Sequence, residues 1–398
     1  LWNVIESYFK EEEGKLLINH QIQSFNDFIL NKIEEIIRGF NTIEVYQKFN
    51  HELDKFEFLV EIDVINPVIT KPIIYEKNGS TKIMTPHEAR QRNFSYSSAL
   101  FVTFDIKCHW LDENGQTITS NKIMKNISMG KIPIMVGSQY CNLNNPMFQF
   151  ANDECKYDNG GYFIINGNEK VVISHDRIAE NKTYVFLDNK LSQYSHVAEI
   201  RSVPDNLFGP PKLTSLKMSS KPSQFGYLIK VSIHHIRTEI PLFVMFRALG
   251  IESDMHIVQH ICLSIKNANN SEIISQLKGS IEEANHITTR AAALDFLSKH
   301  LNVSGYPKEI ITNKTKRISI ISDILRNDFL PHVGKEYCKK ALYLGYMTNK
   351  LLQCFIGVSE MDDRDSYLNK RVDTPGIMLA NLFRQYYGRV VKDMKNAV

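Results

Sequence analysis

The sequence lacks the patterns that mark common metal and nucleotide sites. Its six cysteines are scattered and form no Cys-x-x-Cys pair, whereas a structural zinc site needs closely spaced ligands. No GxxxxGK[ST], GxGxxG, HExxH or GxSxG motif occurs. The usual signals of P-loop, dinucleotide-binding, zinc-protease and α/β-hydrolase chemistry are therefore missing. At the level of motifs, the chain shows no catalytic site.

Targeting signals are scarce as well. The first residues include no basic region followed by an apolar core, and no window approaches the roughly eighteen uncharged apolar residues of a membrane span. Nothing marks the chain as secreted, so its thiols are expected to be reduced. The sequence thus predicts an intracellular protein without a membrane segment. Because position 1 is not Met and the sequence ends just after a helical pattern, we expect a piece of a longer polypeptide.

Net charge is also small. The 47 lysines and arginines nearly balance the 44 aspartates and glutamates, which leaves +3. A nucleic-acid binder of this composition must rely on local patches. The 398 residues, 43% hydrophobic and 23% charged, are typical of a globular protein, and a chain of this length normally forms two domains.

Apolar spacing predicts the first domain. A stripe with three- and four-residue spacing predicts a helix of about five turns that ends at Gly39. Alternating apolar residues then predict strands between residues 56 and 136. Thr85 and Pro86 have the residue types of a helix cap and first turn. This part of the chain should be rich in strands.

The remainder should be mostly helical. Residues 203–222 are rich in proline and predict a loop or a crossing between domains, and helical patterns dominate after Pro241. Thr374 and Pro375 then begin a predicted helix of about 23 residues, whose best packing partner is the first domain. We therefore expect an α+β fold. A strand-rich domain with flanking long helices, residues 1–202 and 373–398, should be interrupted by an inserted, mostly helical domain, residues 203–372.

Residues 158–182 carry the strongest local signal. Asn166-Gly167 favours a type I′ turn between two apolar runs, residues 162–165 and 171–173, so a hairpin is expected. Polar and charged side chains follow at residues 174–177. The hairpin is either an ordinary edge hairpin or a rigid support that presents a site.

Two groups of charged residues invite a chemical interpretation. Asp362, Asp363 and Asp365 could hold Mg²⁺ as in nucleotidyl transfer or a nuclease, or they could form an ion-pair network with Arg364 that braces a domain junction. We prefer the ion-pair network, because the neighbouring cations would compete with a metal. The basic residues could face phosphates if they converge in space: Arg90, Arg92, Lys170, Arg177, Arg201, Lys370 and Arg371.

Eight stretches, in order along nearly the whole chain, resemble the second-largest (β-type) subunit of multisubunit DNA-directed RNA polymerases. Residues 160–181, GGYFIINGNEKVVISHDRIAEN, resemble its Gly-x-Phe-x-Ile-Asn-Gly-x-Glu-Lys/Arg-Val segment. The other stretches are residues 24–28, 88–98, 131–135, 198–202, 246–251, 329–332 together with 344–347, and the DDRD…NKR block at 362–371. The resemblance is greatest to eukaryotic, archaeal and large-DNA-virus forms.

The resemblance implies a role in transcription. It assigns residues 1–202 and 373–398 to the region called the protrusion and residues 203–372 to the lobe. It implies that this part of the subunit has no catalytic residues and no metal, since Mg²⁺ is held by the largest subunit and zinc would lie beyond this segment. Its implied role is to form one wall of the DNA cleft. The implied partners are the largest and other core subunits, template DNA and the DNA–RNA hybrid, and initiation factors.

The implied location depends on the source. Heavy use of Asn, Ile and Lys is compatible with an AT-rich genome, as in some large DNA viruses. Virion or host cytoplasm is expected for a virus-encoded chain, and the nucleus otherwise. A second hypothesis is a stand-alone protein-interaction scaffold derived from such a subunit.

Overall fold

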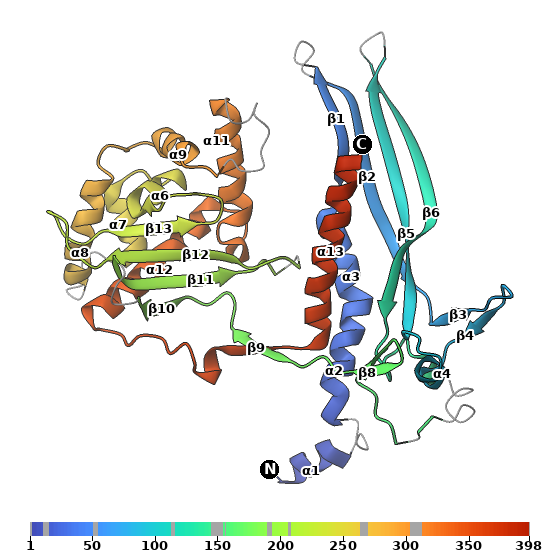
Figure 1. Ribbon diagram of the computed structural model, residues 1–398. Helices are drawn as coiled ribbons and strands as arrows, with labels where there is room; N and C mark the ends of the chain where they lie inside the picture. Colours follow the sequence, from blue (N-terminus) through green and yellow to red (C-terminus); the bar gives the residue numbers. More distant parts are fainter. Residues whose placement is uncertain are drawn as a thin grey trace. The chain divides into compact units, whose positions relative to one another are not determined.

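In a computed structural model, the chain forms two compact units (Figure 1). Unit 1 comprises Leu1–Asp176 and Val372–Val398, and unit 2 comprises Arg177–Arg371. The structure describes residues 2–10, 16–50, 55–112, 116–144, 154–155, 157–188, 193–205, 208–262, 270–302 and 313–397. Within these ranges, no helix has the length and hydropathy needed to cross a membrane.

Unit 1 combines a long antiparallel sheet with helices. Its helical segments are α1 (Trp2–Lys10), α2 (Leu16–Asp27), η1 (Phe28–Lys32), α3 (Ile33–Phe40), α4 (Pro86–Gln91), η2 (Asn142–Asn144) and α13 (Pro375–Ala397). Its strands are β1 (Ile43–Asn50), β2 (Lys55–Ile69), β3 (Ile73–Tyr75), β4 (Thr81–Ile83), β5 (Ser97–Leu111), β6 (Thr117–Pro133), β7 (Phe163–Ile165) and β8 (Asn168–Lys170). The main sheet has the order β1-β2-β5-β6, and β3-β4 and β7-β8 are small hairpins.

The core of unit 1 lies between the main sheet and the helices α3 and α13, which run beside it in Figure 1. The predicted first helix is confirmed, with a π-helical segment, η1, between α2 and α3. Ile33 and Ile36 on its apolar stripe are buried, as are Ile43 on β1 and Val64 on β2. Burying such side chains stabilises the fold by about 1.5–3 kcal/mol each.

The predicted last helix is also confirmed, because α13 begins at Pro375. Its start packs tightly against α2. The Ser24 hydroxyl accepts a hydrogen bond from the Gly376 amide at 3.0 Å and shares a 2.5 Å hydrogen bond with the Thr374 hydroxyl. A Cβ at Gly376 would overlap the Ser24 carbonyl group. Only glycine therefore permits this approach without a shift of one helix.

Unit 2 packs helices on one face of a five-stranded antiparallel sheet. The sheet has the order β10-β11-β12-β13-β14. Its strands are β10 (Tyr184–Leu187), β11 (Tyr194–Ser202), β12 (Lys212–Ser219), β13 (Ile229–Ile233) and β14 (Ile240–Pro241). Its helical segments are α6 (Leu242–Ala248), α7 (Asp254–Cys262), α8 (Asn270–Glu283), α9 (Arg290–Lys299), α11 (Lys314–Asp323), η3 (Ile324–Asp328), η4 (Pro331–Val333), α12 (Tyr337–Ile356) and η5 (Tyr367–Asn369).

The helix α12 is central to unit 2. Leu344, Met347 and Leu351 on it are fully buried. Lys340 is buried too, and its ammonium group donates hydrogen bonds to three backbone carbonyls, those of Leu325 at 2.9 Å, Arg326 at 2.8 Å and Phe329 at 2.5 Å. These bonds satisfy the carbonyls at the end of η3, which lack partners within that helix.

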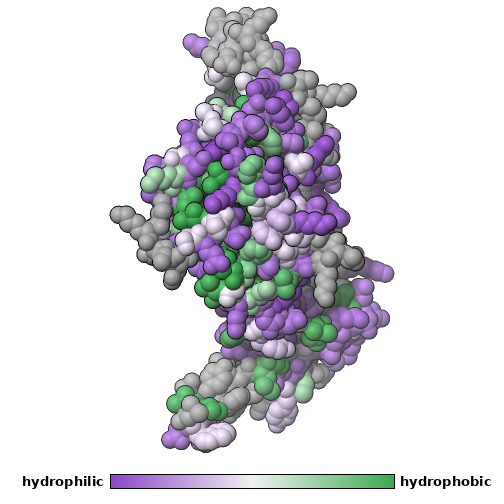
Figure 2. All heavy atoms as spheres, turned by 90° about the vertical axis from the view of Figure 1, so that its left-hand side faces the viewer, coloured by the Kyte–Doolittle hydropathy of each residue, from purple (hydrophilic) through white to green (hydrophobic). Residues whose placement is uncertain are grey.

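Figure 2, seen from the side on which α8 lies in Figure 1, shows a mainly hydrophilic surface with separate hydrophobic groups.

The α+β class is confirmed, but the interior of unit 2 differs from the prediction. The prediction of a loop or crossing at residues 203–222 is only partly right: the described residues before Lys212 lie outside the strands, but Lys212–Ser219 form β12, the central strand of the sheet. The expected first boundary, after residue 202, also differs from the division after Asp176. The reason is that β10 and β11 pair with β12, so all three strands share one core.

The chain crosses between the units twice. It leaves unit 1 through β9 (His175–Ile178) and returns through β15 (Lys370–Asp373), and the two strands pair in a two-stranded sheet. Unit 2 is therefore formed by the segment that lies between the two segments of unit 1.

Candidate nucleic-acid interface

The predicted hairpin exists, but it is shorter than expected. Asn166 and Gly167 have φ values of 50° and 78°, as a type I′ turn requires, and they join β7 to β8. The prediction of a strand at residues 171–173 is wrong: these residues lie outside the strands, and Val171 and Ile173 are exposed. Their β-branched side chains favour a strand, but no neighbouring strand pairs with them in the described structure.

The hairpin is held against the segment that follows α4. The Tyr96 amide donates to the Ile164 carbonyl at 2.9 Å, and the Gly167 amide donates to the Phe94 carbonyl at 3.0 Å. Thr85 caps α4 as predicted, because its hydroxyl accepts a hydrogen bond from the Glu88 amide. The cap and these backbone bonds fix the direction in which α4 presents its basic side chains.

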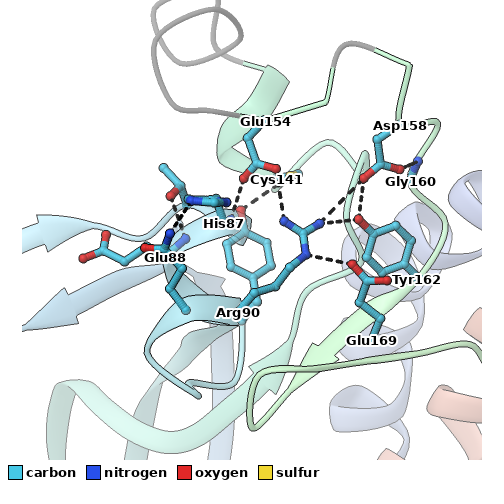
Figure 3. Close-up of polar contacts among 12 residues, drawn as sticks. His87, Glu88, Arg90, Cys141, Glu154, Asp158, Gly160, Tyr162 and Glu169 are labelled. Carbon is cyan, nitrogen blue, oxygen red and sulfur yellow. Dashed lines mark hydrogen bonds and ion pairs between the residues drawn. The ribbon is translucent and has the colours of Figure 1, made fainter.

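Arg90 on α4 lies at the centre of a carboxylate cluster (Figure 3). Its Nε donates to Glu169 Oε1 on β8 at 2.7 Å, and its Nη1 donates to Glu154 Oε2 at 3.1 Å. Its Nη2 donates to the Tyr162 hydroxyl at 2.5 Å and lies 3.7 Å from Asp158 Oδ2. Tyr162 in turn donates to Asp158. All the nitrogens of this guanidinium thus have partners within unit 1.

Burial and pairing act in opposite directions on this cluster. Partial burial lowers the pKa of Arg90, but the hydrogen bonds to Glu154 and Glu169 outweigh it and raise the pKa above its usual value. Burial, together with the Asp158 carboxylate, also raises the pKa of Tyr162. Both groups therefore keep their protons at neutral pH. The cluster joins α4 to the hairpin and to the chain between them.

Arg92 is paired in a similar way. Its Nη1 lies 2.6 Å from Glu76 Oε1 and 3.0 Å from Glu88 Oε1, and its guanidinium lies over the Phe94 ring at 4.9 Å. The hydrogen bond to Glu76 is the largest cause of a raised Arg92 pKa. Arg90 lies on α4 and Arg92 directly follows it as the C-cap, and both are neutralised by nearby carboxylates.

Lys170 differs from these two arginines. It ends β8 as an exposed residue, and within the described residues no carboxylate lies in ion-pair range of its ammonium group. Of the predicted unit 1 cations, Lys170 is the one best placed to meet an anion from solution.

The other four predicted cations belong to unit 2. Arg177 on β9 pairs with Glu180 at 2.8 Å. Arg201 is exposed at the end of β11, and Lys370 is partly buried on β15. Arg371 is exposed and donates to the Lys370 carbonyl at 2.8 Å. The structure thus brings Arg177 and Lys370 onto two paired strands.

The DDRD segment is an ion-paired turn. Asp362 Oδ2 accepts hydrogen bonds from the Lys350 ammonium at 2.7 Å and from the Val185 amide at 2.9 Å. Asp363 accepts from the Asp365 amide at 2.9 Å. The Asp362 contacts hold the segment against α12 and β10, whereas the Asp363 contact lies within the segment, and all of these residues belong to unit 2.

Arg364 completes the brace. It pairs with Glu199 at 3.3 Å and lies over the Phe186 ring at 4.2 Å. Its partner is therefore on β11 and not among the neighbouring aspartates. Across the described ranges, no group of three or more His, Cys, Asp or Glu residues has the arrangement of a metal site.

Known proteins resemble this chain over nearly its full length. The family described as "RNA polymerase beta subunit" matches residues 16–398. DNA-directed RNA polymerase II subunit 2 of Arabidopsis thaliana is 37% identical over 410 residues, which is 100% of this chain and 34% of the relative. DNA-directed RNA polymerase subunit 2 of Acanthamoeba polyphaga mimivirus is 30% identical, over 97% of this chain and 32% of the relative.

One archaeal relative is shorter. DNA-directed RNA polymerase subunit Rpo2N of Methanococcus vannielii is 31% identical over 98% of this chain and 72% of the relative. For most of the relatives compared, in contrast, the chain spans about a third of their length. By the extent of these matches, the chain belongs to the RNA polymerase beta subunit family.

Proposed function

We propose that this chain is the N-terminal part of the second-largest subunit of a DNA-directed RNA polymerase and forms one wall of its DNA cleft. The match of the family to residues 16–398 carries this proposal. The relatives are polymerase subunits by name. In this proposal unit 1 corresponds to the protrusion and unit 2 to the lobe.

The proposal assigns different roles to the predicted basic residues. Lys170, Arg201 and Arg371 are exposed and contact nucleic-acid phosphates. Arg90 and Arg92 hold α4 against its surroundings, because their guanidinium groups are neutralised by carboxylates. Arg177 and Lys370 support the crossing strands β9 and β15 and contact nucleic acid from there.

No catalytic residue or metal ligand is assigned to this chain. In the whole enzyme, Mg²⁺ is held by the largest subunit, and any zinc lies in the part of this subunit beyond the described sequence. The partners are the largest subunit and other core subunits, template DNA, the DNA–RNA hybrid and initiation factors. The site of action is the nucleus, or the virion and host cytoplasm for a virus-encoded enzyme.

Crosslinking tests this proposal. A photoreactive amino acid replaces Lys170, Arg201 or Arg371, one at a time, in the assembled polymerase bound to a DNA–RNA scaffold. Adducts with DNA or RNA are expected at these positions. A matched probe at Lys339, which is exposed but pairs with Glu336, should give none. An equal yield at all four positions would overturn the site assignment.

Copurification separates the polymerase from a scaffold protein. The chain should copurify with the largest subunit in a complex that synthesises RNA on a DNA template. An active polymerase from the same source that lacks this chain would support the scaffold hypothesis. A stop codon after residue 398 would not decide the matter, because Rpo2N is itself a short chain named as a polymerase subunit.

A further inference from the structure

The strand β6 is the free edge of the main sheet of unit 1. It follows β5 in the order β1-β2-β5-β6 and has no other partner strand among the described residues (Figure 1). Of its 17 residues, the first ten are all exposed. An edge strand also presents outward-facing backbone N–H groups, which can bind anions. This strand therefore offers a long, accessible surface.

The composition of β6 is unusual for an edge that is merely solvated. Its sequence, TITSNKIMKNISMGKIP, contains no Asp or Glu. It carries three cations, Lys122, Lys125 and Lys131. It also has four hydroxyl side chains and two amide side chains that can donate hydrogen bonds: Thr117, Thr119, Ser120, Ser128, Asn121 and Asn126. Lysine, serine, threonine and asparagine are side chains that contact nucleic-acid phosphates.

The three lysines keep their charge available. None of them lies in ion-pair range of a described carboxylate. Asp105 is the one carboxylate on the neighbouring strand β5, and it lies beside Lys107, which also pairs with Asp63 on β2 at 2.9 Å. Asp63 and Asp105 are thus engaged by Lys107 and do not neutralise β6.

The register places the lysines on both sides of the edge. Lys122 is opposite Ile106 and Lys131 is opposite Ala99 on β5. Residues 106 and 99 differ by an odd number, so their side chains project to opposite faces of a regular strand. Two register irregularities lie between them and add to the local twist of the edge. At about 3.4 Å per residue, Lys122 and Lys131 are about 30 Å apart along β6. A duplex carries about 18 phosphate charges over that length.

Strand addition by a protein is less favourable at this edge. The register of β6 against β5 is irregular at two places, and Asn126 within it has a φ of 57°. Bulges and lysines on an edge both oppose the pairing of another strand. A sugar–phosphate backbone forms no β-ladder with the strand, so its binding tolerates the same irregularities.

We propose that β6 is a binding site for the sugar–phosphate backbone of nucleic acid. Lys122, Lys125 and Lys131 supply the charge, and the hydroxyl, amide and outward backbone N–H groups between them supply hydrogen bonds. Binding is independent of base sequence, because none of these groups requires a base edge. The inference rests on the proposed function and adds a surface outside the hairpin and the seven predicted cations.

The salt dependence of DNA affinity tests the proposal in the assembled polymerase. Lys122, Lys125 and Lys131 are replaced together by glutamine. The affinity of each polymerase for a mixed-sequence duplex is then measured between about 50 and 200 mM salt, where phosphate contacts strongly change the affinity. The log–log slope should fall by about 2 to 3, since each phosphate contact contributes about 0.9. A control that replaces Lys48, Lys82 and Lys107 removes the same net charge from ion-paired positions in unit 1.

Each outcome decides the matter. A slope change confined to the β6 variant supports the proposal. Equal changes in both variants overturn it, because net charge alone then accounts for the effect. An unchanged slope together with lost binding of a polyglutamate peptide overturns it in favour of an acidic protein partner. Crosslinks at Lys170 with no effect of the β6 variant would end this inference and leave the proposed function in place.

Discussion

Replacing Arg90 by methionine should destabilise unit 1 without weakening DNA binding. Methionine keeps an unbranched apolar side chain but removes the cation that three carboxylates share. Glu154 suffers most, because its side chain is only 8% exposed. Removing one partner of a buried ion pair costs about 3–5 kcal/mol. The Glu169 side chain is 55% exposed and adds little.

The expected loss is therefore about 3 kcal/mol, at the lower end of that range, because Arg90 itself is 24% exposed. This is a large share of the 5–15 kcal/mol that stabilises a typical domain. Denaturant unfolding of the full chain should show a lower midpoint at constant slope. Hydrogen exchange should report faster opening at the Tyr96 amide, which bonds to Ile164 on the hairpin.

A second variant isolates the cause. Adding Glu154→Gln to Arg90→Met should recover part of the lost stability, because the buried carboxylate is then neutral. Arg92→Met is the matched comparison, and it should cost less because the Arg92 pairs are more exposed. The reasoning would be refuted by an Arg90→Met polymerase of unchanged stability whose DNA-affinity salt slope falls by about 0.9.

Two further predictions concern packing and burial. Gly376→Ala should lower the stability of unit 1 by at least about 1–3 kcal/mol, because its Cβ would overlap Ser24. Gly388→Ala on the same helix is the control and should be neutral or stabilising. Equal midpoints of the two variants in denaturant unfolding would contradict this prediction. Burial lowers the pKa of Lys340 to about 8, below that of the unfolded chain, so its folded form favours the neutral amine. As pH rises from about 8 to 10.5, the native chain should therefore gain stability relative to Lys340→Met, by at most about 3 kcal/mol. Denaturant unfolding measures this difference, and a difference that does not change with pH would exclude the linkage.

Local patterns in the sequence predicted the helices well. The apolar stripe of the first helix and the Thr374-Pro375 start of α13 reflect interactions within a few residues, and both elements are confirmed. The Asn166-Gly167 turn is confirmed for the same reason. The prolines before β12 misled the prediction, because they end at residue 211 and a central strand begins directly after them.

Long-range pairing could not be read from the sequence. Arg90 has its Glu154 partner 64 residues and its Glu169 partner 79 residues away, so no spacing rule predicts the cluster. The sequence therefore offers all seven basic residues as candidates for phosphate contact, although Arg90 and Arg92 are neutralised in the structure. The acid-free run of β6 was visible in the sequence, but only the sheet order shows that it is a free edge.

The contact of Ser24 with Thr374 has a consequence for biosynthesis. These residues are 350 positions apart, and a ribosome adds about 5–20 residues per second, so the first helix waits roughly 20–70 s for α13. During that interval all of unit 2 emerges and can fold on its own sheet. The apolar face of α3 remains uncovered by α13 until then, and transiently exposed apolar surface of this kind favours aggregation.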